Sequence, residues 1–351
     1  MRRDVAALLL ATALSCAAFA VPAQGRAILG IGEQKYGMFS DSRFEWLGIR
    51  HARLAVSWDV QLRHDWERAW IGKWLRGAKR DGVVPLVVFG HDWTGARRKL
   101  LPSSEAFRHA FRAFRARYPW VREYTAWNEA NHCSQPTCHH PEAAAAYYDV
   151  VRDECPSCTV VAADVLDQSN MAPWLRAFQR AVRHRPAIWG LHNYLDANRL
   201  RTTGTRQLLS LVRGDVWFTE TGGVVRRTRY KGQAAFPESP EHAAKATTWI
   251  LRVGDTHARV KRIYIYQWNA DTLTQAWDSG LIDPFGQHRP AFEVVARHQG
   301  RDPSQAPADP AFQSPQPEPG PQPQPGPGPQ PQPQPKPPPT CFLQLICPPG
   351  G

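Results

Sequence analysis

The chain of 351 residues has no apolar run of the roughly 20 residues that a helix needs to span a membrane. Its apolar segment at residues 5–14 is too short for this, follows a basic start, and precedes the small residues Ala18 and Ala20. This order is typical of a secretory signal peptide, which we place at residues 1–20. The sequence therefore predicts a secreted, extracellular protein that keeps no transmembrane segment once the signal is removed.

A nucleic-acid-binding motif is also missing, although the formal net charge is +12. The arginines are scattered over several predicted helices, whereas a nucleic-acid interface gathers its basic residues on one face or along one helix. Most of the positive charge is therefore assigned to the solvated surface, and no nucleic-acid partner is expected.

Cysteine is scarce: six residues remain once Cys16 of the predicted signal peptide is set aside. They form three close pairs, namely Cys133 with Cys138, Cys155 with Cys158, and Cys341 with Cys347. An even number of cysteines in an exported chain favours disulfides, and the short spacings favour local ones.

Zinc is the alternative at the first of these pairs, because His132, His139 and His140 lie beside Cys133 and Cys138. A closed zinc site needs four convergent ligands at tetrahedral geometry. Oxidation to a disulfide is the simpler outcome in an exported protein. We therefore expect a disulfide here and no bound metal or other cofactor.

The C-terminal part lacks the apolar side chains that a folded core requires. Residues 303–340 are mainly proline, glutamine and glycine, which predicts a disordered, extended polyproline linker. Residues 341–351 are a short cysteine-containing end, either a small disulfide loop or an attachment element. Residues 24–300 suffice for one large domain, and a second folded domain is not needed.

Within residues 24–300, short apolar runs alternate with amphipathic segments. Eight runs have the composition of buried strands and begin near residues 27, 52, 83, 123, 158, 188, 216 and 262. Helices are predicted between them, for example at residues 103–118, 141–154 and 239–255, where apolar residues recur every three or four positions. Eight such units in about 270 residues match the expected size of a closed (β/α)8 TIM barrel, an α/β fold.

A doubly wound open sheet is the main rival to the barrel. Polar and aromatic side chains follow nearly every predicted strand, which favours the barrel because its strand ends meet at one rim. In an open sheet they would spread along an edge. The residues concerned are Trp58, Asp59, His91, Asp92, Asn128, Glu129, Asp164, His192, Tyr194, Glu220, Trp268 and Asn269.

Two glutamates stand out at this predicted rim. Glu129 follows the fourth strand in EYTAWNEAN, and Glu220 lies at the seventh in DVWFTETGG. Two carboxyl groups facing each other about 5 to 5.5 Å apart can cleave a glycosidic bond with retention of configuration, one as nucleophile and the other as general acid and base. The pair therefore predicts a retaining glycosidase.

The same segments resemble glycoside hydrolase clan A, the barrel enzymes with catalytic glutamates at strands four and seven, and look closest to families 5 and 39. The resemblance extends from about residue 27 to 298. It implies that Glu129 is the acid/base, that Asn128 binds the sugar 2-hydroxyl, and that Glu220 is the nucleophile.

Other rim residues carry over from this resemblance one by one. Arg53 corresponds to an arginine near the nucleophile or is a structural ion pair. One of His192 and Tyr194 is expected to hydrogen-bond the nucleophile while the other packs. Trp268 corresponds to a tryptophan that floors the sugar subsite, or it belongs to the core. His91 either reaches the sugar hydroxyls or is structural.

Several polar residues near the rim keep two interpretations each. Asp59, Asp92, Asp164 and Asp196 could bind sugar or cap helices. The basic residues Arg226, Arg227, Arg229 and Lys231 follow the Glu220 strand, where they either hold an anionic sugar or form a solvated loop.

The sequence thus predicts a secreted retaining glycoside hydrolase that cleaves a polysaccharide or oligosaccharide, with the linker serving as a spacer at a cell wall. Three alternatives remain: a carbohydrate-binding barrel at the cell wall without turnover, a structural wall protein, and a metal-dependent hydrolase built on His132, His139 and His140. The paired carboxylates argue against the first two.

Overall fold

The computed structural model describes residues 26–63, 65–93, 95–227 and 236–308. The predicted signal peptide, most of the predicted linker, and Cys341 with Cys347 lie outside the described residues. Within them, no helix is both long and apolar enough to cross a membrane.

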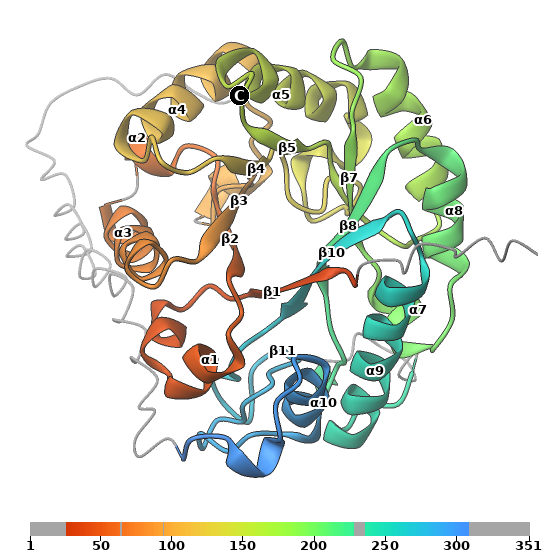
Figure 1. Cartoon of the computed structure of the whole chain (residues 1–351). Helices are drawn as coiled ribbons and strands as arrows, with labels where there is room; N and C mark the ends of the chain where they lie inside the picture. The colour runs from red at the N-terminus through yellow and green to blue at the C-terminus, as the bar shows by residue number, and fades with distance from the viewer. Residues whose placement is uncertain (1–25, 64, 94, 228–235, 309–351) are drawn as a thin grey trace, which may run out of the picture. The chain divides into compact units, whose positions relative to one another are not determined.

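Nine parallel strands form the main sheet of the described residues (Figure 1), in the order β5-β4-β3-β2-β1-β10-β8-β7-β6. They are β1 (Ile28–Gly32), β2 (His51–Ser57), β3 (Val84–Gly90), β4 (Glu123–Thr125), β5 (Thr159–Val161), β6 (Asp164–Leu166), β7 (Ile188–His192), β8 (Asp215–Thr221) and β10 (Val260–Tyr266). Each coincides with a predicted strand, except that the run near residue 158 is divided between β5 and β6.

The two ends of this sheet meet through the chain itself. Only Ala162 and Ala163 separate β5 from β6, and both bond to β7 or the residues beside it: Ala162 N donates to Ile188 O at 2.9 Å, and Gly190 N donates to Ala163 O at 2.9 Å. Because β5 pairs with β4 and β6 with β7, the two short strands together act as one barrel strand. The predicted eight-stranded barrel is confirmed, and the open sheet is excluded.

Helices surround the barrel in Figure 1. They are α1 (Ser42–Leu47), α2 (Val60–Arg63), α3 (Asp65–Arg80), α4 (Ser104–Arg117), α5 (Pro141–Glu154), α6 (Met171–Ala181), α7 (Tyr194–Asn198), α8 (Thr203–Leu211), α9 (Pro240–Thr256) and α10 (Pro290–His298). The sequence signals act as expected: the Ser103 side chain accepts from Ala106 N at the start of α4, and Pro141 opens α5.

Alternation along β3 shows how the sequence builds both sides of the barrel wall. Leu86 and Val88 belong to a small interior cluster with Trp217 and Tyr264. The next residue, Phe89, faces the helices, where its ring centroid lies 5.4 to 5.8 Å from those of three phenylalanines of α4. Because both faces of a barrel strand are covered, a nearly continuous apolar run is what this position requires.

A small antiparallel pair follows the barrel strands β8 and β10. It consists of β9 (Arg226–Arg227) and β11 (Trp277–Asp278), with Trp277 opposite Arg227. Trp277 of this pair also packs edge-on against Tyr194, with ring centroids 4.8 Å apart. The pair therefore joins the segments after two barrel strands into one wall beside the rim.

Candidate active site

A cavity of about 590 Å³ opens where the carboxyl ends of the strands meet. Its lining includes both predicted catalytic glutamates, Glu129 and Glu220. The strand ends thus form one rim around a common pocket, as the barrel interpretation requires.

Glu220 is held by two groups from other parts of the rim. Arg53 of β2 donates from Nη1 to Glu220 Oε2 at 2.5 Å, and Tyr194 Oη donates to Glu220 Oε1 at 3.0 Å. Burial and the adjacent charge of Glu220 raise the pKa of Tyr194 well above its usual value, so the phenol keeps its proton. Both oxygens of Glu220 therefore accept a hydrogen bond, which fixes the orientation of the carboxylate.

Glu129 lies just beyond β4 in a left-handed backbone conformation, with φ of 45°. This conformation costs about 1–2 kcal/mol for a residue other than glycine. It is maintained by the neighbouring backbone: Asn128 N donates to Phe89 O at 2.7 Å, and Ala130 N donates to Asp164 O at 2.8 Å. The strained turn places Asn128 and Glu129 together on the cavity wall.

The two carboxyl groups approach each other closely. One carboxylate oxygen of Glu129, one of Glu220 and a ring nitrogen of His192 all lie within 4.8 Å of one another. Such a separation suits direct attack by one carboxylate, because an inverting enzyme needs about 6.5–9.5 Å to admit a water molecule.

His192 connects Glu129 to a buried carboxylate beneath the cavity. Its Nδ1 lies 3.3 Å from Glu129 Oε1 and its Nε2 lies 3.4 Å from Asp164 Oδ2. Arg53 Nη2 also donates to Asp164 Oδ2 at 3.0 Å and to Asn128 Oδ1 at 2.5 Å. Arg53, Asp164 and His192 are almost completely buried, so they form a rigid base for Asn128, Glu129 and Glu220.

Protonation in this network favours a charged histidine. Burial alone would lower the pKa of His192, but the charge of Glu220 and the hydrogen bonds to Asp164 and Glu129 raise it to about 9. Burial raises the pKa of Glu129, yet the hydrogen bond from His192 and its charge outweigh this effect, and the pKa lies below its usual value. At neutral pH the proton between these two groups therefore resides on His192.

Of the other predicted site residues, most line the cavity or contact the two glutamates, and Trp268 does neither. Asn128, His91 and Tyr194 line the cavity, as do the two glutamates. His192 contacts Glu129, and Tyr194 is the one that bonds Glu220. The prediction that Trp268 lies under the sugar is corrected by the structure. Trp268 is fully buried, donates from Nε1 to Asp41 Oδ2 at 2.9 Å, and lies outside the cavity lining. It packs in the core and does not floor a sugar subsite.

Aromatic residues that the sequence analysis did not single out line the cavity, whereas Trp268 does not. Tyr266 and Trp277 line the cavity near Tyr194, and Trp93 lines it beside His91. Tyr266 could have been found from alternation, since it lies two residues beyond the inward-facing Tyr264 of β10. Trp93 lies in a loop and Trp277 in the two-residue strand β11, and neither segment is long enough or regular enough for periodicity to indicate which way a side chain points.

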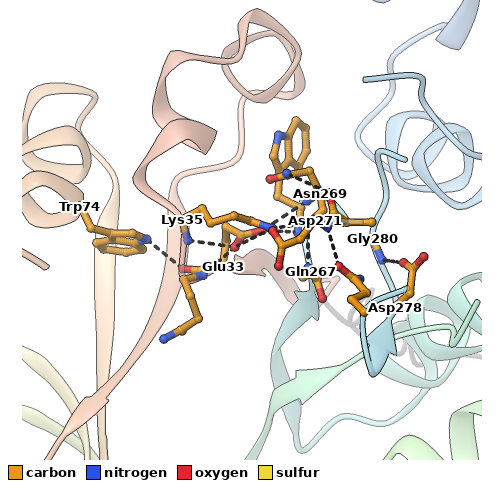
Figure 2. Close-up of polar contacts among 12 residues, drawn as sticks. Glu33, Lys35, Trp74, Gln267, Asn269, Asp271, Asp278 and Gly280 are labelled. Atoms are coloured by element: carbon orange, nitrogen blue, oxygen red, sulfur yellow. Dashed lines mark hydrogen bonds and ion pairs between the residues drawn. The ribbon is translucent and has the colours of Figure 1, made fainter. Parts of the chain in front are cut away.

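A buried carboxylate fixes the rim between the first and last barrel strands (Figure 2). Glu33 Oε1 accepts from the backbone N–H groups of Gln34 and Lys35 at 2.8 and 2.9 Å, and Glu33 Oε2 accepts from those of Trp268 and Asn269 at 3.0 and 3.2 Å. Four backbone donors on one carboxylate join the two loops, so Gln34 and the neighbouring Tyr266 are held on adjacent parts of the cavity wall.

The strand-end aspartates have structural partners. Asp196 accepts from Gly204 N and Thr205 N at 3.1 and 2.7 Å, which caps the start of α8. Asp59 and Asp92 both accept from Arg97. These three and Asp164 lie outside the cavity lining, so none contacts the space that a sugar would occupy.

Among the residues that the structure describes, two groups of side chains come close enough to share a metal ion. In the first, Cys133 and Cys138 are joined to each other by a disulfide beside His139, so their sulfurs are not thiolate ligands. The second is Glu129, His192 and Glu220, in which a protonated imidazole would offer no lone pair. Cys155 and Cys158 form the second predicted disulfide.

The basic loop after β8 is only partly described. Arg227 lines the cavity, but its Nε donates to Glu238 Oε1 at 3.0 Å and its guanidinium lies 4.1 Å from the centroid of the Phe236 ring. Arg229 and Lys231 lie outside the described residues.

Comparison with known proteins supports the same picture. A sequence profile for the family described as glycosyl hydrolase catalytic core matches residues 104–294, more than half of the chain. No curated protein matches the sequence.

Three similar solved structures are distant in sequence and therefore show the fold alone. A family 39 glycoside hydrolase from Bacteroides cellulosilyticus has 14% identity and a TM-score of 0.50, with 77% of this chain and 63% of that chain covered. A GH128 endo-β-1,3-glucanase from Amycolatopsis mediterranei has 13% identity and a TM-score of 0.52, with 77% and 98% covered. Beta-glucuronidase 2 from Bacteroides uniformis has 13% identity and a TM-score of 0.54, with 78% and 34% covered. The chain thus spans less than two thirds of the first and third of these proteins.

Proposed function

This chain belongs to the glycosyl hydrolase catalytic core family, and we propose that it hydrolyses the O-glycosidic bonds of a polysaccharide or oligosaccharide with retention of configuration. The observation that carries the proposal is the proximity of the two carboxyl groups, whose nearest oxygens lie within 4.8 Å across the cavity. Retaining glycosidases need this short separation because one carboxylate must reach the anomeric carbon itself.

Glu220 is the nucleophile in this scheme. The guanidinium of Arg53 and the phenol of Tyr194 hold its two oxygens at 2.5 and 3.0 Å, which orients the carboxylate for attack. Attack on the anomeric carbon forms a covalent glycosyl-enzyme as the leaving oxygen departs.

Glu129 supplies and later removes a proton. In the first step, the proton on His192 Nδ1 passes across 3.3 Å to Glu129, and Glu129 protonates the leaving oxygen. In the second step, the ionised carboxylate takes a proton from the water that attacks the glycosyl-enzyme and returns it to His192, which restores the starting state. The lowered pKa of Glu129 suits this second step, and the neighbouring imidazolium supplies the proton for the first.

The decisive test is the release of reducing ends from a panel of plant, fungal and bacterial polysaccharides. Wild type is compared with Glu129→Gln, Glu220→Gln and the surface control Glu105→Gln. We expect losses of roughly 10²- to 10⁴-fold for Glu129→Gln and at least as much for Glu220→Gln, with none for Glu105→Gln.

Full activity of Glu220→Gln would show that Glu220 is not the nucleophile. Retention of glycans by a wild type that cleaves nothing would instead indicate a carbohydrate-binding barrel.

Export and wall association form a second part of the proposal. They are supported by the signal-like residues 1–20 and the proline-rich residues 303–340. Cell fractionation tests both: the protein should leave the cytoplasm and accompany the wall fraction. Recovery of the intact protein in the culture medium alone would refute wall association.

A further inference from the structure

The loop that follows β3 is fixed to the barrel through one arginine. Arg97 donates from Nε to Asp92 Oδ2 at 2.9 Å and from Nη2 to Asp59 Oδ2 at 2.6 Å. Both carboxylates are fully buried while the guanidinium stays partly exposed, and the two charge-assisted contacts hold the loop against the barrel. Trp93 and Arg98, which lie on either side of Arg97 in the sequence, form part of the cavity wall.

Two side chains of this loop reach the cavity without being used by the fold. Trp93 lines it with 48% of its surface exposed. Arg98 also lines it, is exposed, and has no acidic partner among the residues that the structure describes. Arg227, on another part of the lining, differs because Glu238 neutralises it and Phe236 lies under its guanidinium.

His91 places this part of the wall close to the reacting groups. Its ring lies 6.3 Å from that of Trp93, and both line the cavity together with Glu129. Burial lowers the pKa of His91, the charge of Arg98 lowers it further, and the charge of Glu129 opposes them. His91 therefore lies within electrostatic reach of both Arg98 and the acid/base.

We propose that Trp93 and Arg98 form a subsite for a carboxylated sugar, so that the substrate is a polysaccharide containing uronic acid units. This inference rests on the proposed glycosidase function and adds the class of substrate. An indole face packs against the apolar C–H face of a sugar ring, and a guanidinium binds a carboxylate through two parallel hydrogen bonds. A neutral sugar would use only the first of these contacts.

The test compares binding of acidic polysaccharides with binding of the same polymers after chemical reduction of their carboxyl groups. The probes are 4-O-methylglucuronoxylan, polygalacturonate and alginate oligosaccharides. Calorimetry with Glu220→Gln, which the proposed mechanism makes inactive, measures binding without turnover; if the wild type cleaves none of the probes, the same titration is made with the wild type. At least one acidic probe should bind about tenfold more tightly than its reduced form.

A second substitution assigns this preference to a residue. Added to Glu220→Gln, Arg98→Gln should weaken the acidic probe about tenfold and leave its reduced form unchanged, which is the non-additivity expected of a direct contact. Arg98→Lys should restore part of the difference, and Arg227→Gln should preserve it.

Equal binding of every probe and its reduced form would overturn the proposal. Loss of the preference in Arg227→Gln with Arg98→Gln unaffected would overturn it too. Failure of the hydrolysis panel combined with carboxyl-dependent binding would instead reject the glycosidase mechanism alone.

Discussion

Replacing His192 tests how the active site obtains its catalytic proton. In the wild type, His192 has a pKa of about 9 and its Nδ1 lies 3.3 Å from Glu129. The proton for the leaving group is therefore available below pH 9 and is lost as the pH rises through this value. In His192→Asn, Glu129 must hold the proton itself. Its pKa would rise with the loss of the imidazolium, and a carboxyl group is expected to release its proton at a lower pH than the imidazolium it replaces as proton donor.

At high pH the profile of kcat/KM against pH falls as the proton donor is lost. The size of the effect follows from how far this alkaline limb of the profile moves to lower pH. If the limb moves down by two to three pH units, the variant loses about a hundredfold to a thousandfold in kcat/KM at pH 9 relative to its own maximum. The assay is the pH dependence of kcat/KM on a natural oligosaccharide. A dinitrophenyl glycoside of the same sugar is the control, because its leaving group departs without a proton and its first step should be nearly insensitive to the change.

An alkaline limb that stays near pH 9 in His192→Asn would refute the proton path. Loss of activity at every pH, equal for both substrates, would indicate that His192 only positions the neighbouring groups.

Further substitutions separate binding, folding and catalysis. Trp277→Ala should raise KM in steady-state kinetics with little loss of stability, because Trp277 lines the cavity. Trp268→Phe should lower the free energy of unfolding in urea by about 1–3 kcal/mol, because it removes the buried hydrogen bond to Asp41. Phe89→Ala should lower the free energy of unfolding by roughly 3–5 kcal/mol because the side chain is fully buried against α4, and a smaller change in urea would contradict this packing. Arg53→Lys should reduce kcat about tenfold or more, since an ammonium cannot replace the forked contact with Glu220 and its neighbours; unchanged kcat would exclude an orienting role.

The barrel and the positions of Glu129 and Glu220 could be predicted because they depend on local pattern. Apolar runs separated by amphipathic helices specify the strands, and polar residues at strand ends must meet at one rim once the barrel closes. The division of one predicted strand into β5 and β6 could not be predicted, because CTVVAAD is apolar through both alanines between them.

Side-chain choices at the rim required the structure. His192 and Tyr194 are two residues apart, and the sequence does not say which of them reaches Glu220 across the neighbouring strand. Trp268 follows Tyr264 and Tyr266 with the spacing of a strand, yet β10 ends at Tyr266 and Glu33 binds the backbone N–H groups of Trp268 and Asn269. The tryptophan then packs against Phe44 of α1 and Phe292 of α10, and this outcome depends on a residue more than 230 positions away.

The stereochemistry of hydrolysis tests the two-carboxylate account most directly. Proton NMR of the first product formed from an oligosaccharide substrate shows its anomeric configuration before mutarotation. With nearest carboxylate oxygens within 4.8 Å, the account predicts the same configuration as in the substrate. The opposite configuration would mean that water attacks directly and would contradict the role of Glu220 as nucleophile.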